Sequence, residues 1–139
     1  MTDSLIAGGC LCGAVRYSAE GEPVAVALCH CDDCQRQSGA PFSLNLVVVA
    51  ETLNVEGDLK VFETVGTETG NPRERKFCGT CGSPVITLIE EMPGMAIIKA
   101  GTLDDRSWLQ PGMDLWTDRK QDWLSIAGER IELPTGPPA

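Results

Sequence analysis

Seven cysteines in 139 residues constrain this chain more than any other feature, because they fall into three tight clusters. The clusters are Cys10 with Cys12, then Cys29, Cys31 and Cys34, and finally Cys78 with Cys81. In a reducing compartment, thiols spaced in this way are interpreted as metal ligands rather than as disulfides. The odd number of cysteines also argues against a complete disulfide framework. The spacing favours zinc. The alternatives are buried thiols without a metal, or the ligands of an iron–sulfur cluster.

The spacing also predicts how the cysteines divide between metals. Three thiols within six residues can be brought together by one turn, and closing this triple with a fourth cysteine would break one of the pairs. Joining the two pairs instead gives a closed four-thiolate site, which is typical of structural zinc, whereas the triple leaves an open fourth position, which is typical of a reactive site. We therefore predict two zinc ions per chain. The predicted structural ligands are Cys10, Cys12, Cys78 and Cys81, and the predicted catalytic ligands are Cys29, Cys31 and Cys34.

Three thiolates around one Zn²⁺ leave a net charge of −1, which weakens the metal as a Lewis acid and disfavours hydrolysis. An incoming thiol suits the open position better, because zinc lowers its pKa and the thiolate can then attack a small carbonyl. The sequence thus predicts a carbon–sulfur lyase or thiol-adduct enzyme. Two alternatives remain open: a non-catalytic, zinc-stabilised binding module, and a thiol redox or zinc sensor whose exposed thiolates can be oxidised.

The residues beside the triple have more ordinary interpretations. His30, the only histidine, lies between two ligands, and in extended backbone its side chain points away from the metal. We predict a packed or surface histidine rather than a ligand, with a proton-transfer role left open. Asp32 and Asp33 are predicted to begin a helix. Arg36 either binds a carboxylate or is simply exposed.

The only basic cluster is Arg73-Glu74-Arg75-Lys76. It could attract an acidic thiol, but a solvated strand face is the interpretation that we favour.

Short apolar segments separated by glycine and proline predict an all-β or β-rich domain with short helical turns. No segment has a long helical period and no linker divides the chain, so we expect a single zinc-binding domain over residues 1–133 and a disordered tail over 134–139. A short helix is expected over 32–38, closed by Gly39. The expected strands are two within 5–18, followed by 24–29, 40–50, 59–65, 74–77, 85–89, 95–100 and 113–117.

The formal net charge of −9 excludes general affinity for nucleic acid or anionic membranes, so neither is an expected partner. The chain opens Met1-Thr2-Asp3-Ser4 without a basic residue, and no apolar run approaches the length of a membrane span. We therefore expect a cytoplasmic protein. The sequence carries no indication of oligomeric state.

Three motifs together resemble the glutathione-dependent formaldehyde-activating enzyme family, also called the centromere protein V type. They are Gly9-Cys10-Leu11-Cys12-Gly13-Ala14-Val15, Cys29-His30-Cys31-Asp32-Asp33-Cys34-Gln35-Arg36-Gln37-Ser38-Gly39 and Phe77-Cys78-Gly79-Thr80-Cys81-Gly82-Ser83. The similarity runs from about Gly8 to Trp123. The family usually has a histidine before an apolar-aromatic strand, and the matching segment here, 111–116, contains Asp114.

This resemblance implies a β-tent fold with two zinc sites. By resemblance the four paired cysteines match the structural site. The triple matches a catalytic site at which glutathione and formaldehyde form S-hydroxymethylglutathione. The expected partners are then a small thiol such as glutathione and a small aldehyde.

Overall fold

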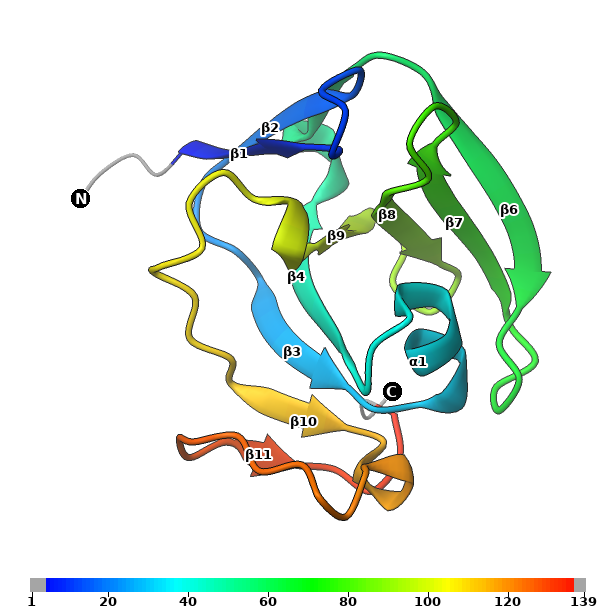
Figure 1. Cartoon of the computed structure of the whole chain (residues 1–139), viewed down its shortest axis with the longest axis vertical. Coiled ribbons are helices and arrows are strands. Elements are labelled where there is room, and N and C mark those ends of the chain that lie inside the picture. Colours follow the sequence, from blue (N-terminus) through cyan, green and yellow to red (C-terminus); the bar gives the residue numbers. More distant parts are fainter. Residues whose placement is uncertain (1–4, 137–139) are drawn as a thin grey trace.

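The computed structural model describes residues 5–136, and strands dominate it (Figure 1). The strands are β1 (Leu5–Gly9), β2 (Arg16–Glu20), β3 (Ala25–Cys29), β4 (Ser43–Val49), β5 (Asn54–Glu56), β6 (Leu59–Val65), β7 (Pro72–Cys78), β8 (Pro84–Ile89), β9 (Met95–Lys99), β10 (Met113–Leu115) and β11 (Ile131–Glu132). Helical structure in this range consists of α1 (Asp32–Ser38) and the 3₁₀ turns η1 (Ala50–Thr52), η2 (Ala100–Thr102) and η3 (Thr117–Arg119). The prediction of a β-rich fold is confirmed.

The strands form two sheets. The smaller has the order β1-β2-β5, and the larger has the order β11-β10-β3-β4-β9-β8-β7-β6. Most neighbours are antiparallel, but β10 runs parallel to both β3 and β11. The β1–β2 hairpin lies across one face of the larger sheet (Figure 1). This arrangement gives the larger sheet one face toward the core and another face toward α1.

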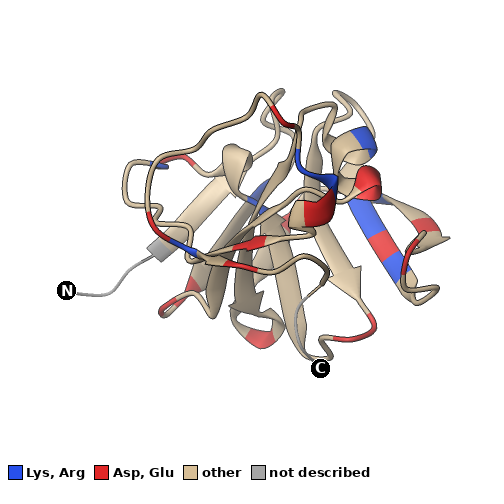
Figure 2. Cartoon of the chain, turned by 90° about the horizontal axis from the view of Figure 1, so that it is seen from below, with Lys and Arg blue, Asp and Glu red and all other residues tan. Residues whose placement is uncertain are grey.

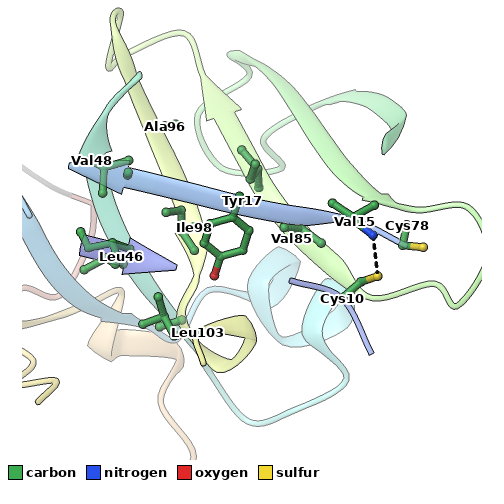
Figure 3. Packing of buried hydrophobic residues seen from close by; sticks show 14 residues of the cluster. Cys10, Val15, Tyr17, Leu46, Val48, Cys78, Val85, Ala96, Ile98 and Leu103 are labelled. Atoms are coloured by element: carbon green, nitrogen blue, oxygen red, sulfur yellow. Dashed lines mark hydrogen bonds between the residues drawn. The ribbon is translucent and has the colours of Figure 1, made fainter. Parts of the chain in front are cut away.

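The hydrophobic core fills the space between the two sheets (Figure 3). Tyr17 from β2 packs with Leu46 and Val48 from β4 and with Ile98 from β9. Because side chains alternate along a strand, the residues between these core positions in β4 and β9 point to the opposite face. Close packing also explains Gly8, where a Cβ atom would lie 2.3 Å from the carbonyl oxygen of Thr102.

Helix α1 lies at the end of β3 (Figure 1) and is fixed at both ends. The thiol of Cys31 caps its first turn by accepting a hydrogen bond from the backbone N–H of Cys34, and Gly39 ends it in the left-handed conformation with φ of 69°. Asp33 accepts hydrogen bonds from the backbone N–H and the hydroxyl of Thr67, at 2.8 and 2.6 Å. The turn between β6 and β7 is thereby attached to the helix.

Several predicted boundaries agree with the structure. The helix over 32–38 and the strand over 59–65 are confirmed. The strand predicted over 40–50 is shorter, at Ser43–Val49, and its last predicted residue belongs to η1. Sequence reasoning missed β5 and β11, which have three and two residues. Such short strands depend on the partner beside them rather than on their own pattern.

The predicted tail begins with residues that are hydrogen-bonded. The carbonyls of Pro134 and Thr135 accept hydrogen bonds from the backbone N–H groups of Asp118 and Trp116. Residues 137–139 lie outside the described residues. Acidic segments are spread over turns on several sides of the molecule (Figure 2). None of the helices within the described range has the length and apolar character needed to cross a bilayer.

Candidate metal centres

The two pairs of cysteines, which are predicted to share one zinc, lie close together. Cys10 and Cys12 lie in the turn after β1, while Cys78 ends β7 and Cys81 lies in the turn before β8. Their four sulfur atoms all lie within 4.8 Å of one another. The distance from the Cys12 sulfur is 3.6 Å to that of Cys10 and 3.8 Å to that of Cys78. In a tetrahedral site with Zn–S bonds of about 2.3 Å, neighbouring sulfurs are about 3.8 Å apart, so this set fits a closed zinc site.

The surrounding backbone holds these sulfurs in place. The Cys10 sulfur accepts a hydrogen bond from the N–H of Val15 at 3.3 Å, drawn in Figure 3, and the Cys78 sulfur accepts one from Thr80 at 3.4 Å. Hydrogen bonds from the hydroxyl and backbone of Ser83 lower the pKa of Cys81 to about 5. Donors of this kind favour the thiolate form that a metal requires.

The triple forms a second group, again with all sulfurs within 4.8 Å of one another. Cys29 ends β3, and Cys31 and Cys34 lie at the start of α1. Cys29 and Cys34 are buried, whereas Cys31 is partly exposed. Within the described residues, no other His, Cys, Asp or Glu side chain joins this group. The arrangement supplies three ligands and leaves the remaining direction of a tetrahedron without a protein ligand.

The three thiols share charge unequally when no metal neutralises them. Hydrogen bonds from Cys29 and then Cys34 hold the pKa of Cys31 well below the usual thiol range, and the charge of Arg75 adds to this effect. The same hydrogen bond with Cys31 raises the pKa of Cys29. A metal ion binds all three sulfurs as thiolates, so a bound cation would release the protons that they carry.

Lys99, a residue that sequence reasoning did not single out, lies beside this cluster. It is buried, and its ammonium donates hydrogen bonds to the hydroxyl of Ser43 at 2.9 Å and to the side-chain oxygen of Asn45 at 3.2 Å. Burial lowers the pKa of Lys99, while the negative charges of the three thiols, Cys34 foremost, act in the opposite direction. The sequence signal for Lys99 is its place as the last residue of an otherwise apolar strand, Met95–Lys99.

His30 is fully buried, which confirms that it is a packed residue rather than a ligand of the cluster. Its Nε2 atom lies 2.8 Å from a carboxylate oxygen of Asp114, and because that carboxylate accepts, Nε2 carries the hydrogen. Arg130 donates to the other carboxylate oxygen at 2.6 Å. Although burial raises the pKa of Asp114, the hydrogen bonds from His30 and Arg130 outweigh it and hold that pKa below its usual value.

The remaining predicted residues lie around α1. Asp32 and Asp33 are in its first turn, as predicted. Arg36 lines an open groove of about 550 Å³ together with Trp123. None of the three clustered cysteines is among the described residues that line this groove. The groove is therefore a separate feature of the outer helix face.

Comparison with known proteins gives consistent matches. The family model described as "Glutathione-dependent formaldehyde-activating enzyme" matches residues 5–119, a range that contains all seven cysteines. A Halomonas elongata protein named "Putative glutathione-dependent formaldehyde-activating enzyme" is 28% identical over 127 residues, which cover 88% of this chain and 81% of the relative. The crystal structure of a Rhodobacter sphaeroides protein matches with a TM-score of 0.57 and 23% identity, over 76% of this chain and 91% of the other. This last similarity shows a common fold.

Proposed function

The chain belongs to the glutathione-dependent formaldehyde-activating enzyme family, and from this membership we propose that it joins a small thiol, such as glutathione, to a small aldehyde, such as formaldehyde. The observation that carries the proposal is the group formed by Cys29, Cys31 and Cys34, three converging thiols whose fourth direction has no protein ligand among the described residues. A purely structural role would be served by the four-thiol group alone.

The two groups have different tasks in this proposal. Cys10, Cys12, Cys78 and Cys81 would hold a structural zinc that joins the turn after β1 to the turn after β7. Cys29, Cys31 and Cys34 would hold a second zinc, which would bind the sulfur of the incoming thiol and lower its pKa. The thiol sulfur then forms a bond to the aldehyde carbon. The carbonyl oxygen takes up the proton that the thiol released, and the product is an S-hydroxyalkyl adduct.

The chain's own residues hold the reacting region rigid. The backbone N–H of His30 donates to the carbonyl of Leu115 at 3.0 Å, and its ring is fixed by Asp114. The side-chain amide of Gln35 donates to the carbonyl of His30 at 2.8 Å. The charge of Lys99 stabilises the negative charge that gathers on the thiolates. The ligands are thus pre-organised before the thiol arrives.

We expect Cys31→Ser to reduce the zinc content from two ions per chain to one while the fold is retained, because the other cysteine group is untouched. Adduct formation should fall to the uncatalysed rate. Metal analysis, thermal unfolding and NMR exchange spectroscopy of glutathione with formaldehyde measure the three quantities. Val61→Ser, on the exposed strand β6, is the matched control. A Cys31→Ser protein with two zinc ions or unchanged exchange rates would contradict the proposal.

A thiol redox or zinc sensor is the second candidate, and the partial exposure of Cys31 favours it. A small oxidant can reach this sulfur, and its oxidation would remove one of three ligands. The sensor function predicts that hydrogen peroxide releases one zinc ion per chain from a protein that does not accelerate adduct formation with any thiol. If the protein accelerates adduct formation with any one thiol, the enzyme function is supported and the sensor function is contradicted.

A further inference from the structure

Two buried cations face the three-cysteine group from the larger sheet. Lys99 and Arg75 have relative exposures of 7% and 8%. Arg75 is paired across the sheet with Thr87, and Thr87 with Ile97, two residues before Lys99. Directly paired and alternate positions share a face, so Arg75, Thr87 and Lys99 point to the same side of the sheet. Cys29 lies on that side too, because it is paired with Ser43, whose hydroxyl accepts a hydrogen bond from Lys99.

The basic cluster on β7 is divided by this alternation. Arg73 forms an ion pair with Glu91 through its two terminal guanidinium nitrogens. Lys76 is paired with Ile86, a core residue, and therefore points to the opposite face from Arg75. The interpretation of this cluster as a solvated strand face is thus wrong for Arg75, which is buried beside the thiols.

Arg75 has no carboxylate partner within residues 5–136, and its guanidinium makes no hydrogen bond there. None of its nitrogens is fully enclosed, since the buried, unpaired side-chain atoms are those of His30, Gln37 and Thr87. The guanidinium therefore keeps a route to solvent. Arginine cannot give up its proton, so its N–H donors need an acceptor, and the described chain supplies none.

Thr87 adds an independent observation. Its hydroxyl is buried, with 4% relative exposure for the residue, and it has no hydrogen-bond partner among the described residues. Buried hydroxyls are normally paired, so an unpaired one in the same row as an unpaired guanidinium indicates a position for an acceptor. A carboxylate satisfies both, because its two oxygens can accept from the guanidinium and the hydroxyl together.

We propose that Arg75 and Thr87 form an anion subsite beside the three-cysteine group, and that this subsite binds a carboxylate carried by the thiol substrate. The inference rests on the proposed function, since it assumes that a thiol enters at the open position. It names the substrate class: thiols that carry a carboxylate within reach of the sulfur. Lys99 acts as a positioning charge for the thiolates.

The test is thiol binding to the full chain with cobalt(II) in place of zinc, whose absorption changes when a further thiolate binds. The probes are mercaptoacetate, 3-mercaptopropionate and 4-mercaptobutyrate, each compared with its primary amide, which has nearly the same size and shape but no charge. We expect the acid to bind at least about tenfold tighter than its amide at one chain length or more. Arg75→Gln should reduce that preference to less than about threefold.

Lys76→Gln is the matched control, because it removes the same charge from the same strand on the opposite face, and it should retain the preference. Thr87→Val should lower the preference severalfold, and it tests the subsite even where Arg75→Gln does not fold. Equal binding of acid and amide by the natural chain at all three lengths would overturn the subsite alone. Equal effects of Arg75→Gln and Lys76→Gln would also overturn it. No absorption change with any thiol would instead contradict the proposed function.

Discussion

Replacement of Cys78 by serine is expected to abolish cooperative folding of this protein. Cys78 is 1% exposed, belongs to the hydrophobic core, and its sulfur lies 3.8 Å from that of Cys12, 66 residues away in the chain. A structural zinc site of this kind contributes about 10–16 kcal/mol of binding free energy to folding. This is as large as the whole stability of a typical domain, about 5–15 kcal/mol. A protein that loses one of four ligands should therefore be largely unfolded at room temperature.

Circular dichroism, amide NMR spectra and bound zinc measure this outcome. Cys31→Ser is the natural comparison, because it also replaces one thiol by a hydroxyl but removes a ligand of the other group. The two variants should differ sharply, with Cys78→Ser unfolded and Cys31→Ser folded. A Cys78→Ser protein that stays soluble and melts at an unchanged temperature would show that the four-thiol group does not stabilise the fold.

The cysteine groups could be predicted from sequence because their internal geometry is local. Cys29, Cys31 and Cys34 are within six residues, and the helix that follows is indicated by the acidic residues at its start and by Gly39 at its end. Each pair is equally local, so only one long-range contact had to be inferred. The contact between the two pairs could be inferred from the four ligands that a closed zinc site requires, without knowledge of the strand order.

The cations beside the triple could not be predicted in this way. Lys99 meets the thiols because β9 is the neighbour of β4, and β4 the neighbour of β3. Arg75 faces the same thiols because β7 is the neighbour of β8, and β8 the neighbour of β9. Strand order depends on the whole chain and cannot be found from one segment. Alternation along β7 predicts that Arg75 and Lys76 point to opposite faces of the sheet, but it does not predict which of the two faces is buried.

Replacement of Asp114 by alanine is expected to lower the free energy of unfolding by about 3–5 kcal/mol, because it leaves a buried cation without its partner. Asp114 is 2% exposed and joins His30 to Arg130, whose side chain is 7% exposed. Arg130 also donates to the carbonyls of Ala127 and Ile126, at 2.9 and 3.1 Å, so it cannot swing into solvent without losing several bonds. The carboxylate therefore links β10, β3 and the segment before β11.

The same substitution should weaken the open metal site, since β10 pairs with β3 and the residues paired with Leu28 and Cys29 are Asp114 and Leu115. Urea unfolding gives the stability, and competition with a chelator gives the affinity of the second zinc. Asp118→Ala is the control, because the side chain of Asp118 is 45% exposed and its loss should change the stability by no more than about 0.5 kcal/mol. Equal effects of the two substitutions would mean that the buried carboxylate is not what holds His30 and the end of β3 beside the thiols.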